Sequence, residues 1–266
     1  MVLRELLHLL RYDILHDRSD QVDGDGSDYL WSDWTLVKFI DEAQRRFARR
    51  ALVIQDATTP QCTEVTVASY TKEYPLDTSV ISVKSAKLAS FDDNGVMQYN
   101  HADLARAGHT ALGTYHTPDP YFFDPSQLSN MTPGKPMAYA TDEGVTADDE
   151  GTMSVVNLRL YPVPSPEYAG QIVKLRVIRM PLDRLYYRNL EATPEVPEIY
   201  HLDMLDWAAY LALRIVDRDA GDSPRANEFR ASFDDHVKTA RNEMLRKMFT
   251  PMQWGFGRNG FSWEGN

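Results

Sequence analysis

A glycine-rich motif near the end of the chain has the letter pattern of a dinucleotide-binding loop. The motif runs Gly255-Phe-Gly257-Arg-Asn-Gly260. Such glycines hold a pyrophosphate where they join a strand to the start of a helix. Here the motif follows a predicted helix and lies close to the last residue. We therefore expect no nucleotide site and no cofactor.

An acidic segment near the start of the chain has the spacing of a calcium loop. From Asp23 to Asp28, oxygen-bearing side chains stand at alternate positions, as they do where several oxygens surround one calcium ion. The glycine and the glutamate that such a loop needs at its sixth and twelfth positions are Asp28 and Trp34 here. A solvated acidic turn is the favoured interpretation, and an ion site in residues 17–28 is the alternative.

No set of histidines or carboxylates has a catalytic pattern. The seven histidines lack the spacing of a zinc protease. A hydrolase would need a pair of carboxylates, and nothing in the sequence arranges the nearest candidates, Asp92, Asp93, Asp142 and Glu143. The single cysteine, Cys62, excludes an internal disulfide and fits synthesis in a reducing cytoplasm. We predict that the protein is not an enzyme and holds no metal.

The charge and hydropathy of the chain limit its partners. The net charge is -11, with 39 acidic residues against 28 lysines and arginines, so the surface should repel phosphate and disfavour sequence-specific DNA binding. Charged residues interrupt the apolar run at the N-terminus, and no run approaches the roughly 18 apolar residues of a membrane span. We expect a soluble protein with no membrane partner.

A basic strip lies on a predicted helix of residues 33–55. Its arginines are spaced four apart in two pairs, which places each pair on one helix face. One interpretation is a solvated face. The other is a subunit interface, in which the strip meets the acidic Asp23 and Asp25 of a neighbouring copy, or a docking partner. The arginines are Arg45, Arg46, Arg49 and Arg50.

Two aromatic segments lie where the glycine and proline content predicts loops. Exposed aromatic side chains on irregular backbone usually pack against another chain. The first segment, in the irregular stretch 91–150, contains Tyr115, Tyr121, Phe122 and Phe123. The second is the C-terminal tail, with Trp254, Phe256, Phe261 and Trp263. We favour docking of the tail onto a partner, with packing on its own domain as the alternative.

The periodicity of the apolar residues predicts the elements that carry these segments. Helical spacing appears over residues 2–15 and 33–55, after Pro197, and again from Ser223. The leucines of the first segment either complete the core or require a partner surface. In the helix after Pro197, Ile199 and Leu202 are expected on the buried face.

The residues between these helices favour strands. From Thr63 to Leu182, β-branched residues recur with partial alternation. We predict an α+β fold, with a helical bundle built from both chain ends, an inserted antiparallel β-domain and an extended C-terminal tail. The expected domains are a helical core of residues 1–59 and 184–248, a β-domain of residues 60–183, and a tail of residues 249–266.

Two helical blocks resemble those of head-to-tail adaptor (connector) proteins of tailed bacteriophages. The first is Trp31-Ser-Asp-Trp-Thr-Leu-Val-Lys-Phe-Ile-Asp-Glu-Ala-Gln-Arg-Arg-Phe47, and the second is Pro197-Glu-Ile-Tyr-His-Leu-Asp-Met-Leu-Asp-Trp-Ala-Ala-Tyr-Leu-Ala-Leu213. The predicted order of elements agrees as well. The β-domain is larger than in the smallest adaptors, so the resemblance does not identify the protein that this domain contacts.

The resemblance implies a structural protein of the virion, located at the head–tail junction. Such adaptors form a ring, usually of about twelve copies, beneath the portal protein. Residues 249–266 would insert into the portal, the Tyr115–Phe123 loop would face tail or nozzle proteins, and DNA would pass through an acidic bore without sequence-specific binding. The alternative is a calcium-dependent carbohydrate- or receptor-binding virion module.

Overall fold

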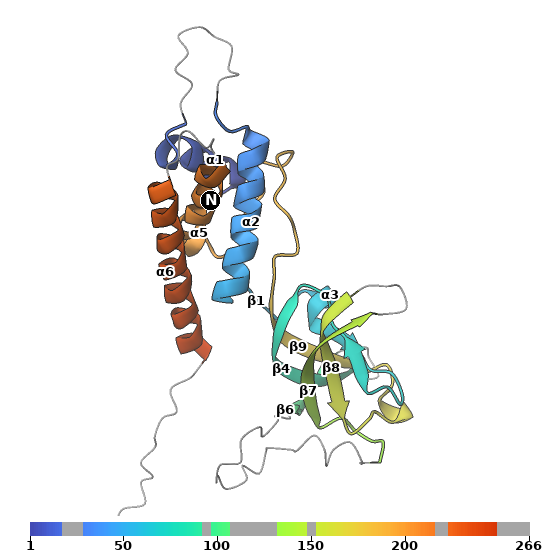
Figure 1. The fold of residues 1–266 in the computed structure, drawn as a ribbon. Coiled ribbons are helices and arrows are strands. Elements are labelled where there is room, and N and C mark those ends of the chain that lie inside the picture. Colours follow the sequence, from blue (N-terminus) through green and yellow to red (C-terminus); the bar gives the residue numbers. More distant parts are fainter. Residues whose placement is uncertain (18–28, 92–96, 107–131, 148–152, 216–222, 249–266) are drawn as a thin grey trace, which may run out of the picture.

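The protein consists of a helical part and a β part, joined by two crossings of the chain (Figure 1). The computed structural model describes residues 1–17, 29–91, 97–106, 132–147, 153–215 and 223–248. Helices and mainly antiparallel sheets are both present, which confirms the α+β class. No helix among these residues is long and apolar enough to cross a membrane.

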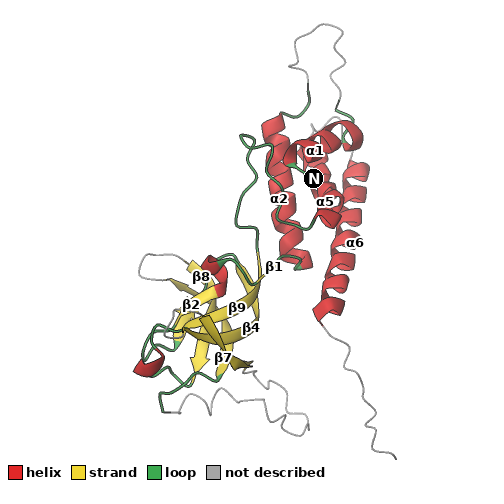
Figure 2. Ribbon diagram, turned by 180° about the vertical axis from the view of Figure 1, so that it is seen from behind, coloured by secondary structure: helices red, strands yellow, loops and turns green. Residues whose placement is uncertain are grey.

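The helical part contains segments from both ends of the sequence (Figure 2). Aromatic side chains from three of these segments meet at its centre, where the Phe47 ring lies 5.4 Å from that of Tyr200 and 6.0 Å from that of Phe233. The helices are α1 (Leu3–His8), its π-helical continuation η1 (Leu9–Ile14), α2 (Asp33–Ala51), the 3-10 turn η3 (Glu198–Tyr200), α5 (His201–Ile215) and α6 (Ser223–Met248).

The β part contains two sheets with a shared apolar core. Side chains such as Val83, Leu158 and Val173 fill this core. The first sheet has the order β1 (Gln55–Asp56), β9 (Ile172–Arg179), β4 (Val80–Phe91), β5 (Met97–Asp103), and β2 (Glu64–Thr66) also pairs with β9. The second has the order β3 (Glu73–Pro75), β8 (Met153–Tyr161), β7 (Ala138–Ala147), β6 (Ala105–Arg106). Short helical turns lie at α3 (Pro60–Thr63) and η2 (Pro166–Tyr168).

The N-terminal leucine stripe completes the core of its own chain. Leu3, Leu6 and Leu10 are fully buried. The backbone N–H of Leu3 also donates to the carbonyl of Ala192 over 2.8 Å. Of the two interpretations of this stripe, packing within the subunit is therefore the one that the structure supports.

The start of the helix after Pro197 differs from the prediction. Ile199 and Leu202 were expected on the buried face, but they are 69% and 57% exposed. Ile199 lies in the 3-10 turn that precedes α5, so it does not share the phase of the α-helix. Leu202 lies about 200° around the helix axis from Met204, which is fully buried.

Candidate interaction surface

Helix α2 places the four predicted arginines at its C-terminal end. The helix starts at Asp33 because the Ser32 hydroxyl accepts a hydrogen bond from the Thr35 N–H over 3.2 Å. It ends at Ala51, because the next residue, Leu52, has a left-handed backbone with a φ of 58°. The buried stripe of α2 faces the helical core, so the arginines, which fall in its last two turns, lie at the side of that stripe.

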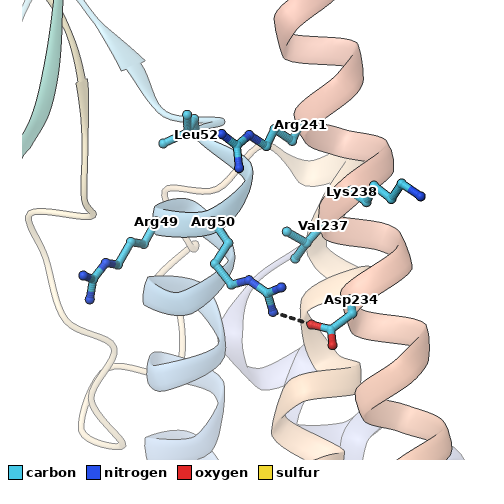
Figure 3. A pocket seen from close by; sticks show the side chains of 7 residues that line it. All are labelled: Arg49, Arg50, Leu52, Asp234, Val237, Lys238 and Arg241. Carbon is cyan, nitrogen blue, oxygen red and sulfur yellow. Dashed lines mark hydrogen bonds and ion pairs between the residues drawn. The ribbon is translucent and has the colours of Figure 1, made fainter.

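Two of these arginines make contacts within the subunit. The Arg46 guanidinium lies over the buried Trp207 ring, 3.9 Å from its centroid, which is a cation–π arrangement. Arg50 forms an ion pair with Asp234 of α6 (Figure 3). These contacts tie α2 to α5 and to α6.

A groove of about 400 Å³ lies between the C-terminal end of α2 and the middle of α6. Figure 3 shows Arg241 reaching from α6 toward Leu52, while Arg49 and Lys238 point outward on opposite sides. Leu52 and Val237 give the groove an apolar component. Its lining residues are Arg49, Arg50, Leu52, Asp234, Val237, Lys238 and Arg241.

A second groove of about 420 Å³ adjoins the first, since both are lined by Arg49 and Arg50. Its other lining residues are Glu42, Arg45, Arg46 and Met180. We call the six cations of the two grooves the arginine surface: Arg45, Arg46, Arg49, Arg50, Lys238 and Arg241.

The arginine surface has a strong excess of positive charge. The only carboxylates among the lining residues are Glu42 and Asp234, and Asp234 is already paired with Arg50. Within the described part of the chain, no ion pair involves Arg49, Lys238 or Arg241. A local positive surface on a chain of net charge -11 is suited to an acidic protein partner.

A network of ion pairs lies where the chain passes between the helical part and the β part. Arg179, at the end of β9, donates from Nε to Asp56 over 2.7 Å and also pairs with Glu195. Burial by itself raises the pKa of Asp56, but hydrogen bonds from Thr58, Thr59 and Arg179 outweigh this and hold the pKa below its ordinary value. The carboxylate is therefore ionised at neutral pH, and it joins β1 to β9.

The sequence profile of one protein family, described as SU10 adaptor protein, matches residues 3–254. The match includes both the helical part and the β part. The chain belongs to the SU10 adaptor protein family. This is a family of phage head-to-tail adaptors, so the resemblance seen in α2 and α5 is confirmed, as is a structural role in a phage virion. No curated protein matches the chain.

Several predicted contact residues of this SU10 adaptor lie outside the described residues. They are Asp23 and Asp25 of the proposed subunit interface, the loop residues Tyr115, Tyr121, Phe122 and Phe123, and the tail residues Trp254, Phe256, Phe261 and Trp263. The carboxylates of Asp92 and Asp93 lie outside them too. The structure therefore tests none of these assignments.

Asp17 is the one residue of the predicted acidic loop that the structure describes. Its carboxylate accepts a hydrogen bond from the buried Arg11 over 2.6 Å and another from the backbone N–H of Leu30 over 3.0 Å. Asp17 therefore connects η1 to the residues that immediately precede α2. Among the residues with a described position, no group of histidine, cysteine or acidic side chains is arranged to hold a metal ion.

Sequence reasoning missed the contribution of α6 to the surface of this SU10 adaptor. Asp234, Lys238 and Arg241 are separated by four and three residues, so they share one face of α6. This spacing was a usable signal. The position of these three residues beside α2 was not predictable. It depends on the packing of two helices that lie some 190 residues apart in the sequence.

Proposed function

We propose that this adaptor forms a ring at the head–tail junction of a tailed phage. The ring docks beneath the portal, continues the DNA channel and provides the attachment site for tail proteins. The family match over residues 3–254 is the observation that carries this proposal. We also propose a copy number of about twelve, which the resemblance to phage adaptors implies. A location in the virion is consistent with the family match.

We assign a different role to each of three regions of the chain. The helical core (residues 1–59 and 184–248) would form the ring, the β-domain (residues 60–183) would face the tail, and residues 249–266 would dock into the portal. Two separate buried cores, one for the helices and one for the sheets, support a division into two domains. The aromatic side chains of the tail supply apolar contact area for the portal.

A ring of identical copies requires a contact between two different patches of the same chain. The arginine surface supplies one patch. The sequence offers Asp23 and Asp25 as acidic residues for the other patch. DNA would pass the acidic inner surface without sequence-specific binding, since that surface offers phosphates little attraction.

The aromatic loop residues Tyr115, Tyr121, Phe122 and Phe123 would contact tail or nozzle proteins. This assignment rests on the aromatic content of the loop, because such side chains supply much of the binding energy at protein interfaces. Synthesis in the host cytoplasm fits the single cysteine.

The experiment is to measure the mass of the purified protein alone and after mixing with portal rings of the same phage. A chain truncated after Phe249 is measured in parallel, together with a full-length variant in which Trp254, Phe256, Phe261 and Trp263 are changed to alanine. The full chain should join the portal in a subunit ratio close to one to one, and both altered chains should fail to join.

Two outcomes would count against parts of the proposal. If the truncated chain binds as well as the full chain, the tail has no docking role. If the full chain does not bind at all, the adaptor ring loses its support. Calcium-dependent glycan binding by the aromatic loop is then the function to test.

A further inference from the structure

The cations of the groove between α2 and α6 are only partly used within the subunit. Arg50 is paired with Asp234. Arg49 on α2 and Lys238 and Arg241 on α6 are exposed, and they form no ion pair within the described residues. The groove therefore retains three cations that can bind the carboxylates of another chain.

An exposed apolar pair lies at the start of α5. Ile199 and Leu202 are both mostly exposed, and they are three residues apart in the sequence. Two carboxylates flank the pair: Asp203 follows Leu202, and Glu243 of α6 accepts a hydrogen bond from the Tyr200 hydroxyl over 2.8 Å. In the part of the chain that the structure describes, no lysine or arginine pairs with either carboxylate. We call Ile199, Leu202, Asp203 and Glu243 the α5 patch.

The groove and the α5 patch lie on opposite sides of α6. Successive residues of an α-helix are turned by about 100°, so Glu243 lies about 160° around the axis of α6 from Arg241. The side that bears Glu243 faces α5, because His236 on the same side has its Nδ1 3.7 Å from the Asp203 carboxylate. The side that bears Arg241 lines the groove beside α2 (Figure 3).

Both surfaces occupy the same stretch of α6. The groove is lined by α6 residues from Asp234 to Arg241, and the α5 patch adjoins α6 from His236 to Glu243. A second copy placed beside the first, with its helices parallel to those of the first, would thus bring its α5 patch against the groove. Because the two surfaces differ, the same contact can repeat from copy to copy, as a ring requires.

The two surfaces are complementary in their chemistry. Leu52 and Val237 give the groove an apolar component, and Ile199 and Leu202 give the α5 patch another. The free cations of the groove would meet the carboxylates of the patch, and arginine binds a carboxylate through two parallel hydrogen bonds. Duplex DNA also attracts cations, but a chain of net charge -11 repels it at long range, which favours a protein partner.

We propose that the groove of each copy binds the α5 patch of the next copy. The inference rests on the proposed ring and names its contact. Arg49, Lys238 and Arg241 of one copy pair with Asp203 and Glu243 of the next, and the apolar side chains of the patch pack over the apolar part of the groove. The α5 patch then takes the place of the predicted acidic loop as the counterpart of the arginines.

The test is a charge reversal in full-length chains. The groove variant carries Arg49→Glu, Lys238→Glu and Arg241→Glu, and the patch variant carries Asp203→Lys and Glu243→Lys. The number of adaptor copies per portal ring is measured by native mass spectrometry, and thermal unfolding checks that each variant is folded. Each variant should need about tenfold more protein than the wild type for half-occupancy, because like charges then face each other. A chain with all five substitutions should load like the wild type, since its contacts are complementary again.

Two further variants separate the contact from net charge and from misfolding. Arg176→Glu, Arg184→Glu and Arg188→Glu together change the net charge as much as the groove variant does, at exposed positions outside both surfaces, and this chain should load like the wild type. The second variant, Ile199→Ser with Leu202→Ser, alters only exposed side chains, so it should fold normally and yet load more weakly. It tests the patch even if the patch variant does not fold.

Three outcomes would overturn the proposal. The first is normal loading by the folded groove variant or by the serine variant. The second is a folded chain with all five substitutions that fails to regain loading, which would assign the groove to the portal or to another partner. The third is tight binding of a random duplex of about 30 base pairs by the wild type, abolished in the groove variant, which would assign the groove to DNA. A wild type that does not load, measured in parallel, would instead show that the proposed ring itself is wrong.

Discussion

Arg179 donates its Nε–H to the Asp56 carboxylate over 2.7 Å and thereby joins the strand that enters the β part to the strand that leaves it. The two residues are 123 positions apart in the sequence. Backbone pairing of Gln55 with Ile178 and of Asp56 with Val177 surrounds this ion pair. The ion pair therefore holds together the two strands through which the chain enters and leaves the β part.

Removal of the Arg179 cation should destabilise the protein strongly. Arg179→Met leaves the buried carboxylate of Asp56 and the partly exposed carboxylate of Glu195 without their cation. We expect a loss of about 3–5 kcal/mol in the free energy of unfolding, measured by denaturant titration. Arg176→Met is the matched control, because Arg176 is exposed on the same strand, and it should change this free energy by less than about 0.5 kcal/mol. Equal effects of the two substitutions would show that the ion pair has no special role.

The hydrogen bonds from Thr58, Thr59 and Arg179 to the Asp56 carboxylate predict a dependence of stability on pH. The pKa of Asp56 in the folded protein lies below its ordinary value of 3.8, so the unfolded chain binds more protons in the interval between the two values. The contribution of Asp56 is complete above its ordinary pKa and decreases as the pH falls below it. Denaturant unfolding from pH 6 to pH 3 should therefore show a smaller loss of stability in Asp56→Asn than in the wild type. Parallel curves for the two proteins would contradict this.

The elements of this fold were more predictable than their contacts. The period of the apolar residues predicted α2, α5, α6 and the strands β2, β4, β8 and β9, because a helix or a strand must bury one face. It did not predict β5 and β7, which lie in the stretch 91–150 that was expected to be irregular. Ile199 and Leu202 show the limit of this argument, since the sequence does not specify where a 3-10 turn gives way to an α-helix.

The candidate surface was predictable only in part. Its α2 arginines were visible as a spacing pattern, but the α6 cations acquire their role through tertiary packing. The Arg179 network was not predicted, because its partners Asp56 and Glu195 come from distant segments. Pairing of this kind depends on topology, which a residue pattern in one segment does not contain.

Leu6 and Leu202 give a direct test of which leucines belong to the core. Leu6 in α1 is fully buried, while Leu202 in α5 is 57% exposed. Leu6→Ala should lower the free energy of unfolding by about 2–5 kcal/mol, because it creates a cavity between α1 and the rest of the helical part. Leu202→Ala removes the same atoms from a solvated site and should cost less than about 0.5 kcal/mol. If the two variants unfolded at the same denaturant concentration, the N-terminal helix would not be part of the core.

Calcium should leave the stability of the protein unchanged. The Asp17 carboxylate is already occupied by Arg11 and by the backbone N–H of Leu30, and it is buried, so it is not free to turn toward an ion. An ion that binds the folded state raises the unfolding temperature in proportion to the logarithm of its concentration, so a site in residues 17–28 would be detected by this readout. We expect thermal unfolding curves in calcium chloride, in magnesium chloride of equal ionic strength and in a chelator to coincide. An increase specific to calcium, and lost in Asp23→Asn/Asp25→Asn, would instead establish the ion site and revive the carbohydrate-binding alternative.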